Sequence, residues 1–167
     1  MKTSDLKQQF LTSLKNGKIG IFRPQTEISE LKAILSVKVE LIDTDYGGVW
    51  LGDNIEIFFE KGFLSRVRFK FYEYQKSGEW LEVINLSWLD YLSELSFWDT
   101  KEVLVEAGSK FKSIEYDNGE LAILSSTPHA QLMIFFYEDG KLDQAHLEFD
   151  LRFRLFNDIK EFTGYPR

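Results

Sequence analysis

The sequence predicts an α+β protein made of two tandem αα-ββββ-like repeats, with one antiparallel sheet and helices on one of its faces. Residues 55–71 have the pattern of a β-hairpin, namely an apolar run, a turn closed by Gly62, and then alternating apolar and polar residues. The same pattern returns in residues 132–149, where Gly140 takes the place of Gly62. Each hairpin follows two helix-like segments and two strand-like segments, and such self-similarity indicates a duplicated unit. The alternative is two unrelated β-meanders that share ordinary hairpin chemistry.

The first repeat is expected to begin with two helices. Residues 4–16 form the first, with Thr3 or Ser4 as a cap, and the second begins at Thr26 with Glu27 in its first turn. Residues 19–22 between them are expected to be extended. The apolar residues near helical spacing are Leu6, Phe10, Leu11 and Leu14 in the first helix, and Ile28, Leu31, Ile34 and Leu35 in the second.

A four-stranded meander follows in the first repeat. Residues 37–42 alternate between apolar and polar, residues 43–48 read as a turn with Gly47 and Gly48, and residues 49–51 form a second strand. The hairpin completes the meander. This unit covers residues 1–75.

The second unit covers residues 76–167, including a C-terminal tail, and the two units are expected to form one compact domain. Residues 79–84 are interpreted as a strand, with the lead into a helix as the alternative. Ser87 and Asp90 resemble a capping box for a helix that ends near Leu95 and turns Trp88, Leu89, Leu92 and Leu95 inward. A second helix covers residues 99–107, and strands are expected at 111–116 and 121–124. The last strand of the hairpin is expected to continue to residue 155, before a short helical turn at 158–162.

Composition excludes several classes of protein. The chain has 167 residues and no cysteine, so disulfides, thiolate metal sites and cysteine nucleophiles are absent. The N-terminus has no apolar signal region, and no apolar run is long enough to span a bilayer, so a cytoplasmic protein is expected. Residues 1–75 carry a net charge of +1 and residues 76–167 carry −8. A nucleic-acid-binding protein needs the opposite sign.

The acidic charge is concentrated in residues 79–120, which hold ten carboxylates and three lysines. One interpretation is an ordinary solvated surface. The other is a docking surface for a basic protein, because such a field steers association and exposed aromatic residues anchor an interface. The residues expected to bind the partner are Glu79, Trp80, Glu82, Asp90, Glu94 and Trp98.

No catalytic, metal or cofactor motif is visible. His129 lies in a predicted loop and His146 lies on the polar side of a predicted strand, so both are interpreted as ordinary surface residues. The carboxylate pairs Asp43/Asp45 and Asp117/Glu120 lie in matching turns, where turn chemistry explains them. We therefore expect a protein that is not an enzyme and holds no cofactor or metal.

Aromatic residues also lie on or beside the predicted strands. A sheet covered by helices on one face leaves the other face open, where aromatic residues would form a binding platform; core packing is the alternative. The residues concerned are Tyr46, Trp50, Phe71, Tyr72, Tyr74, Trp80, Trp88 and Trp98.

The first repeat resembles a helix-plus-meander unit of small bacterial proteins, some of which are immunity proteins that neutralise toxins. The resemblance rests on Gly20-Ile21-Phe22, Thr26, Glu30-Leu31, Ile34-Leu35, Trp50, Ile57-Phe58-Phe59, Gly62, Leu64 and Val67. The tandem arrangement is similar to the β-lactamase inhibitor protein fold, in which two units form a concave sheet that grips an enzyme. The chain departs from the usual pattern because it lacks a glycine shortly before Thr26 and has Pro24 nearby.

The resemblance implies a non-enzymatic, immunity-type protein that binds and inhibits a toxin, plausibly a basic nuclease, through an acidic and aromatic surface. The alternative is an accessory module that binds a small apolar ligand or a host protein on an open sheet face. Neither nucleic acid nor a membrane is an expected partner. The chain is expected to be a monomer or a weak homodimer that pairs through a sheet edge.

Overall fold

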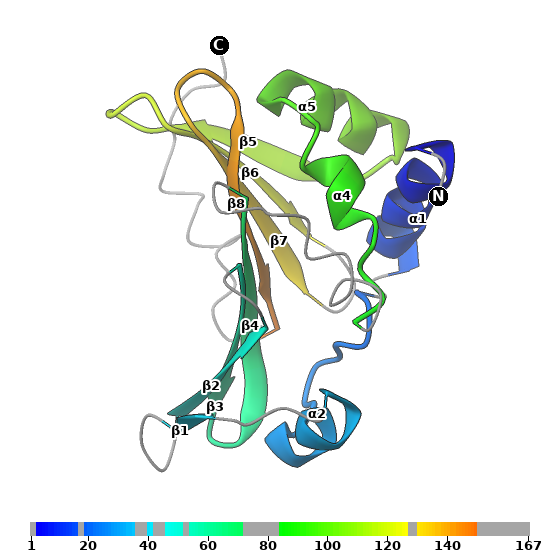
Figure 1. Ribbon diagram of the computed structural model, residues 1–167. Helices are drawn as coiled ribbons and strands as arrows, with labels where there is room; N and C mark the ends of the chain where they lie inside the picture. The colour runs from blue at the N-terminus through cyan, green and yellow to red at the C-terminus, as the bar shows by residue number, and fades with distance from the viewer. Residues whose placement is uncertain are drawn as a thin grey trace.

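The computed structural model describes residues 3–16, 19–35, 40–41, 46–51, 54–71, 84–126 and 130–149. These residues form an α+β fold in which four helices pack against an eight-stranded antiparallel sheet (Figure 1). The helices are α1 (Thr3–Asn16), α2 (Ile28–Leu35), α4 (Leu89–Leu92) and α5 (Phe97–Glu106). The strands are β1 (Glu40–Leu41), β2 (Tyr46–Leu51), β3 (Ile55–Glu60), β4 (Phe63–Lys70), β5 (Phe111–Glu115), β6 (Leu121–Ser126), β7 (Gln131–Phe136) and β8 (Leu142–Glu148).

The strand order is β1-β2-β3-β4-β8-β7-β6-β5, so each repeat contributes a four-stranded meander to one continuous sheet. The last strands of the two repeats, β4 and β8, pair at the centre, with Val67 opposite Leu147. Because the order reads the same from either edge, the two halves are related by an approximate two-fold arrangement. The predicted fold class, with two αα-ββββ-like repeats and helices on one face, is confirmed.

The two hairpins also share an irregularity. The pairing register shifts between Phe58 and Phe59 in the first and between Phe135 and Phe136 in the second, which are equivalent positions. Gly62 (φ +82°) and Gly140 (φ +79°) occupy their turns. Both turns therefore use the left-handed backbone region that glycine enters without a steric penalty.

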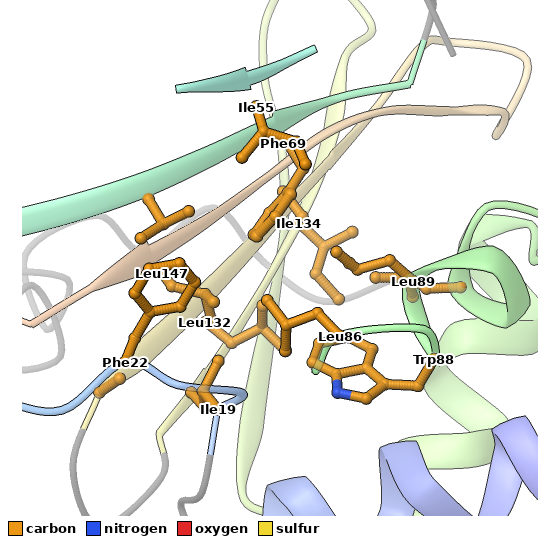
Figure 2. Packing of buried hydrophobic residues seen from close by; sticks show 14 of the residues in the cluster. Ile19, Phe22, Ile55, Phe69, Leu86, Trp88, Leu89, Leu132, Ile134 and Leu147 are labelled. Atoms are coloured by element: carbon orange, nitrogen blue, oxygen red, sulfur yellow. The ribbon is translucent and has the colours of Figure 1, made fainter. Parts of the chain in front are cut away.

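The hydrophobic core lies between the sheet and the helices and joins both repeats. Ile55 and Phe69 of the first repeat, and Ile134 and Leu147 of the second, point into it beside Leu86 and Leu89 (Figure 2). Alternate residues of the strands are buried, as the period of two in a strand requires. The inward faces expected for α1 and for residues 88–95 are confirmed: Phe10, Leu14, Trp88, Leu89 and Leu92 are buried, while Leu6, Leu11 and Leu95 are partly buried.

Two predicted helix starts are wrong. Thr26 does not cap α2, because its hydroxyl donates to the Arg23 carbonyl at 2.8 Å and accepts from the Arg23 amide at 3.1 Å. The carbonyl of Glu27 accepts the first amides of α2 instead. Ser87 does not form a capping box with Asp90, since Trp88 is the N-cap of α4 and makes no side-chain capping bond. Ile34, expected to face inward, is half-exposed.

Two short segments also differ from prediction. Gly47 and Gly48 lie within β2 rather than in a turn. A Cβ at position 48 would lie 2.7 Å from the Trp50 ring, so glycine there leaves room for the indole. Residues 19–22 form a tight turn, not an extended segment, closed by the Phe22 amide and the Ile19 carbonyl at 3.1 Å. Gly20 has φ +60° in this turn.

Several expectations lie outside the described residues: most of the strand at 37–42, the turn at 43–45, the unit boundary at 75–78, the strand at 79–83, His129, the strand extension at 150–155 and the helical turn at 158–162. The division into units at residue 75 therefore stays a prediction. In the part of the chain that the structure describes, no helix is long and apolar enough to cross a membrane.

Candidate functional site on helices α4 and α5

The start of α5 is held by a complete capping box. The Ser96 hydroxyl accepts a hydrogen bond from the Asp99 amide at 3.2 Å, and the Ser96 amide donates to the Asp99 carboxylate at 3.1 Å. The hydrogen bond from the Ser96 hydroxyl, together with that from its amide, lowers the pKa of Asp99. The predicted acid-bearing helix is confirmed, but it begins two residues before Asp99, at Phe97. The capping box therefore fixes where the outward face of α5 begins.

In the first turn of α5, Phe97 faces the core and Trp98 faces the surface. Phe97 is buried, and its ring packs edge-on against Phe136 of β7 at 5.4 Å. The Phe97 amide also donates to the Gly140 carbonyl in the β7–β8 turn at 2.9 Å. Trp98 is 63% exposed, and its ring contacts Phe97 edge-on at 4.9 Å. The indole is thus presented outward from a helix turn that is anchored to the sheet.

The surface around Trp98 is acidic with an apolar centre. Lys101 lies 5.3 Å from the centroids of both the Phe97 and Trp98 rings, a cation–π arrangement. Val105, one helical turn beyond Lys101, is 68% exposed. We define the α4–α5 surface by the exposed or half-exposed residues Asp90, Glu94, Trp98, Asp99, Lys101, Glu102, Val105 and Glu106. It contains five carboxylates and one lysine.

One of these carboxylates has a partner from another helix. Lys7 of α1 forms an ion pair with Glu106 at 2.5 Å, and the hydrogen bond to Glu106 raises the pKa of Lys7. Both side chains are substantially exposed, so this pair adds little stability. The remaining carboxylates leave the α4–α5 surface strongly negative.

The structure places half of the predicted partner-binding residues on this surface. Asp90 lies on α4, Glu94 follows it, and Trp98 lies on α5. Glu79, Trp80 and Glu82 lie outside the described residues. The prediction omitted Glu102 and Val105, which helical spacing from Trp98 would have identified, because residues four and seven apart share one helix face.

None of the described helices packs on the opposite face of the sheet, the helix-free face, which carries a row of charged residues at its centre. Glu56 of β3 is 6% exposed and pairs with Arg68 and with Lys70, the latter at 2.6 Å. Burial would raise the pKa of Glu56, but hydrogen bonds from Lys70 and Arg68 outweigh it and lower the pKa overall. Arg66 pairs with Glu148 across β4 and β8. This row makes the centre of the face polar.

His146 belongs to the same row and is not the ordinary surface residue that was expected. It is half-buried, lies opposite Arg68 in the sheet, and its ring is 5.0 Å from the Phe135 ring. Burial, reinforced by the positive charges of Arg66 and Arg68, lowers the pKa of His146 to about 4. The imidazole is therefore neutral at physiological pH.

This low pKa predicts acid sensitivity. Because the unfolded chain has an ordinary histidine pKa near 6.5, it binds a proton more readily than the folded chain, and stability is lost as pH falls from about 6.5 towards 4. The free energy of unfolding is expected to fall by about 2 kcal/mol between pH 7 and pH 5. Urea denaturation over this range measures it, and His146→Gln should remove most of the slope. Between pH 7 and pH 5 the Glu56 carboxylate stays ionised in the folded chain, because its pKa is lowered. A flat wild-type profile would contradict the assigned environment.

Two residues of the predicted aromatic platform do not lie on an open face of the sheet. Phe71 and Trp88 are buried in the main core. Trp50 is half-exposed and lies over Gly48. On β6, Ala122 and Leu124 are buried in a second hydrophobic cluster with Ile114, Met133 and Phe135, which register places on the helix-free face. Ala122 and Leu124 are therefore shielded from solvent on this part of the face.

In the described ranges, no group of three or more His, Asp or Glu side chains is placed to hold a metal ion.

The comparisons with known proteins give a fold and no activity. No protein-family model matches the chain, and no curated protein matches it. Among solved structures, the chain is similar to a DUF4309 family protein (YjgB) from Bacillus subtilis subsp. subtilis str. 168. The TM-score is 0.50 and the sequence identity 14%, over 88% of this chain and 97% of that chain. Identity this low supports a shared architecture only.

Proposed function

We propose that this chain is a non-enzymatic binding protein that holds a basic protein partner on its α4–α5 surface. The observation that carries the proposal is Trp98, an exposed indole fixed by Phe97 on a capped helix and surrounded by carboxylates. Tryptophan is enriched among the residues that dominate binding energy, and rigid presentation reduces the entropy lost on association. Val105 extends the apolar centre that such an anchor needs.

The charges on this surface suit association with a positive partner. Glu94, which precedes α5, and Asp99 and Glu102 on α5 are exposed and lie within four residues of Trp98 in the sequence. Exposed charges of one sign increase the rate of encounter with an oppositely charged protein more than they increase the final affinity. The partner we propose is therefore a protein with a basic surface and a cavity for an indole.

We propose more specifically that the partner is a toxin, such as a basic nuclease, and that the chain is a cytoplasmic immunity-type inhibitor. It rests on the resemblance of the helix-plus-meander unit to bacterial immunity proteins and on the acidic surface. Acidic inhibitors suit basic nucleases because the field that attracts nucleic acid also attracts a negative protein.

The proposal predicts how binding responds to substitution. Trp98→Ala is expected to weaken partner binding by about 30-fold or more, which is the size of an interface hot spot. Reversing two charges with Glu94→Lys and Glu102→Lys should slow association and flatten its dependence on salt. The measurement is capture from a lysate of the source organism at low salt, mass identification, and then association kinetics of the purified partner across a salt series.

Asp117→Lys is the matched control for charge. Asp117 is exposed at the tip of the β5–β6 hairpin, away from α5 (Figure 1), and its reversal changes the net charge by the same amount per site. Its variant should bind like the wild type. If Trp98→Ala and the double reversal bind as well as the control, the α4–α5 surface is not the binding site. A partner without basic character would remove the electrostatic part of the proposal.

A further inference from the structure

A second candidate site shares no residue with the α4–α5 surface. It is a cavity of about 430 Å³ that is open to solvent, between α1 and the segment that leads into α4, and most of its polar lining residues are exposed. This volume lies within the range of about 300–1,000 Å³ that is typical of small-molecule sites. Its lining residues are Asp5, Gln8, Gln9, Thr12, Ser13, Asn16, Gly20, Asn85 and Trp88.

One face of α1 supplies most of the polar lining. Asp5, Gln9, Thr12 and Asn16 recur at intervals of three or four residues, so they form one stripe along the helix. The opposite face of α1 is apolar, with Phe10 and Leu14 buried in the core. The helix therefore places amides and hydroxyls side by side along the cavity.

Trp88 gives an independent sign that a ligand is recognised here. It lines the cavity and is only 3% exposed, yet its indole N–H has no hydrogen-bond partner within the described residues. In Figure 2 the indole nitrogen lies on the edge of the ring turned towards α1, drawn in blue. A buried donor without an acceptor is unfavourable by about 1–3 kcal/mol, so a ligand whose acceptor reached this nitrogen would remove that cost.

The backbone beside the cavity has a hydrogen bond between two segments and one residue in a left-handed conformation. The Ile21 amide donates to the Ile84 carbonyl at 3.1 Å, which joins the turn after α1 to the segment before α4. Asn85 has φ +56°, a left-handed conformation that asparagine tolerates better than most residues. This conformation presents an exposed amide at the rim, and residues held in such conformations are concentrated at ligand sites.

We propose that this cavity binds a neutral polyhydroxylated molecule, a mono- or disaccharide. Carboxamides and hydroxyls both donate and accept hydrogen bonds, as the hydroxyls of a sugar do, and the Trp88 N–H adds a donor at depth. The lining contains no lysine or arginine, which a phosphate or carboxylate ligand would need. It contains one carboxylate, Asp5, which is too few for a hard cation. A neutral ligand is the class that these groups recognise.

The test uses the Trp88 indole N–H as a reporter. In the ¹⁵N-labelled protein, Trp88→Phe assigns its NMR signal by loss of that signal alone. Titration with glucose, N-acetylglucosamine, maltose and myo-inositol is expected to shift the Trp88 signal saturably with at least one of them. The signals of the exposed Trp50 and Trp98 should stay in place.

Two mild substitutions keep the test independent of Trp88. Thr12→Val removes a hydroxyl from the lining with little change of shape, and Asn85→Gly removes an amide while keeping the left-handed backbone. Each should weaken sugar binding roughly 5- to 10-fold, the size of one lost hydrogen bond. Lys15→Ala, on α1 but outside the lining, should have no effect.

The proposal fails if none of these compounds moves the Trp88 signal at the highest soluble concentration. It also fails if binding is undiminished in both Thr12→Val and Asn85→Gly, because the sugar would then lie elsewhere. The protein-binding proposal for the α4–α5 surface is unaffected by any of these results.

Discussion

Phe10→Ala is expected to lower the free energy of unfolding by about 3–5 kcal/mol, the usual result of removing a fully buried phenylalanine. The Phe10 side chain has no exposed surface, and its ring lies 4.9 Å from the Trp88 ring and 6.4 Å from the Tyr91 ring. These contacts attach α1 to α4. Alanine favours the helix more than phenylalanine does, which offsets only about half a kcal/mol. Urea denaturation followed by circular dichroism measures the change.

Leu11→Ala is the matched control for Phe10→Ala. Leu11 is the next residue on the same helix, it packs against the same core, and it is only partly buried. Its replacement should cause less than half of the loss, because less apolar surface returns to water. Equal losses from the two variants would show that Phe10 does not attach α1 to the core.

The fold was predictable where the local preferences of the residues and their burial favour the same structure. The hairpins combine alternating residues with a turn glycine at Gly62 and Gly140, so both the strands and the turns between them follow from sequence. The inward residues of α1 follow from helical spacing in the same way. The joining of the repeats through β4 and β8 is different, because pairing between distant strands has no local signature in the sequence.

The wrong predictions arise where tertiary contacts override local preference. Thr26 has the residue type of a helix cap, but the turn at Pro24 and Gln25 brings the Arg23 backbone within its reach first. Ser87 is followed by Trp88, whose burial against Phe10 decides where α4 begins. A short polar side chain contributes about 1 kcal/mol as a cap, whereas burial of an aromatic ring contributes more.

The candidate sites were predictable only in part for a related reason. The acidic character of residues 79–120 can be read from composition, and Trp98 was identified. That Trp98 is exposed while Trp88 is buried depends on which side of each helix meets the sheet. The cavity beside α1 has no sequence signature, because its polar stripe looks like any solvent-facing side of an amphipathic helix. Its role becomes visible only when Trp88 and Asn85 are brought beside it.

Gly20→Ala is expected to lower the free energy of unfolding by about 2–5 kcal/mol, from two separate causes. Gly20 has φ +60°, which is unfavourable for alanine by about 1–2 kcal/mol. The new Cβ would also lie 2.2 Å from the Ile84 carbonyl oxygen and 2.8 Å from the Leu86 side chain. Since that oxygen accepts the Ile21 amide, the backbone must shift, which costs about 1–3 kcal/mol more.

Gly108→Ala separates the two causes. Gly108 has φ +66° at the end of α5, and a Cβ there would meet no atom within 4 Å. It should therefore show the conformational penalty alone, about 1–2 kcal/mol, and the difference between the two variants measures the contact with Ile84 and Leu86. If both variants lose the same stability, the turn at Gly20 is not packed against that segment. Gly20 also lines the cavity beside Trp88, so this comparison also tests the geometry of the proposed sugar site.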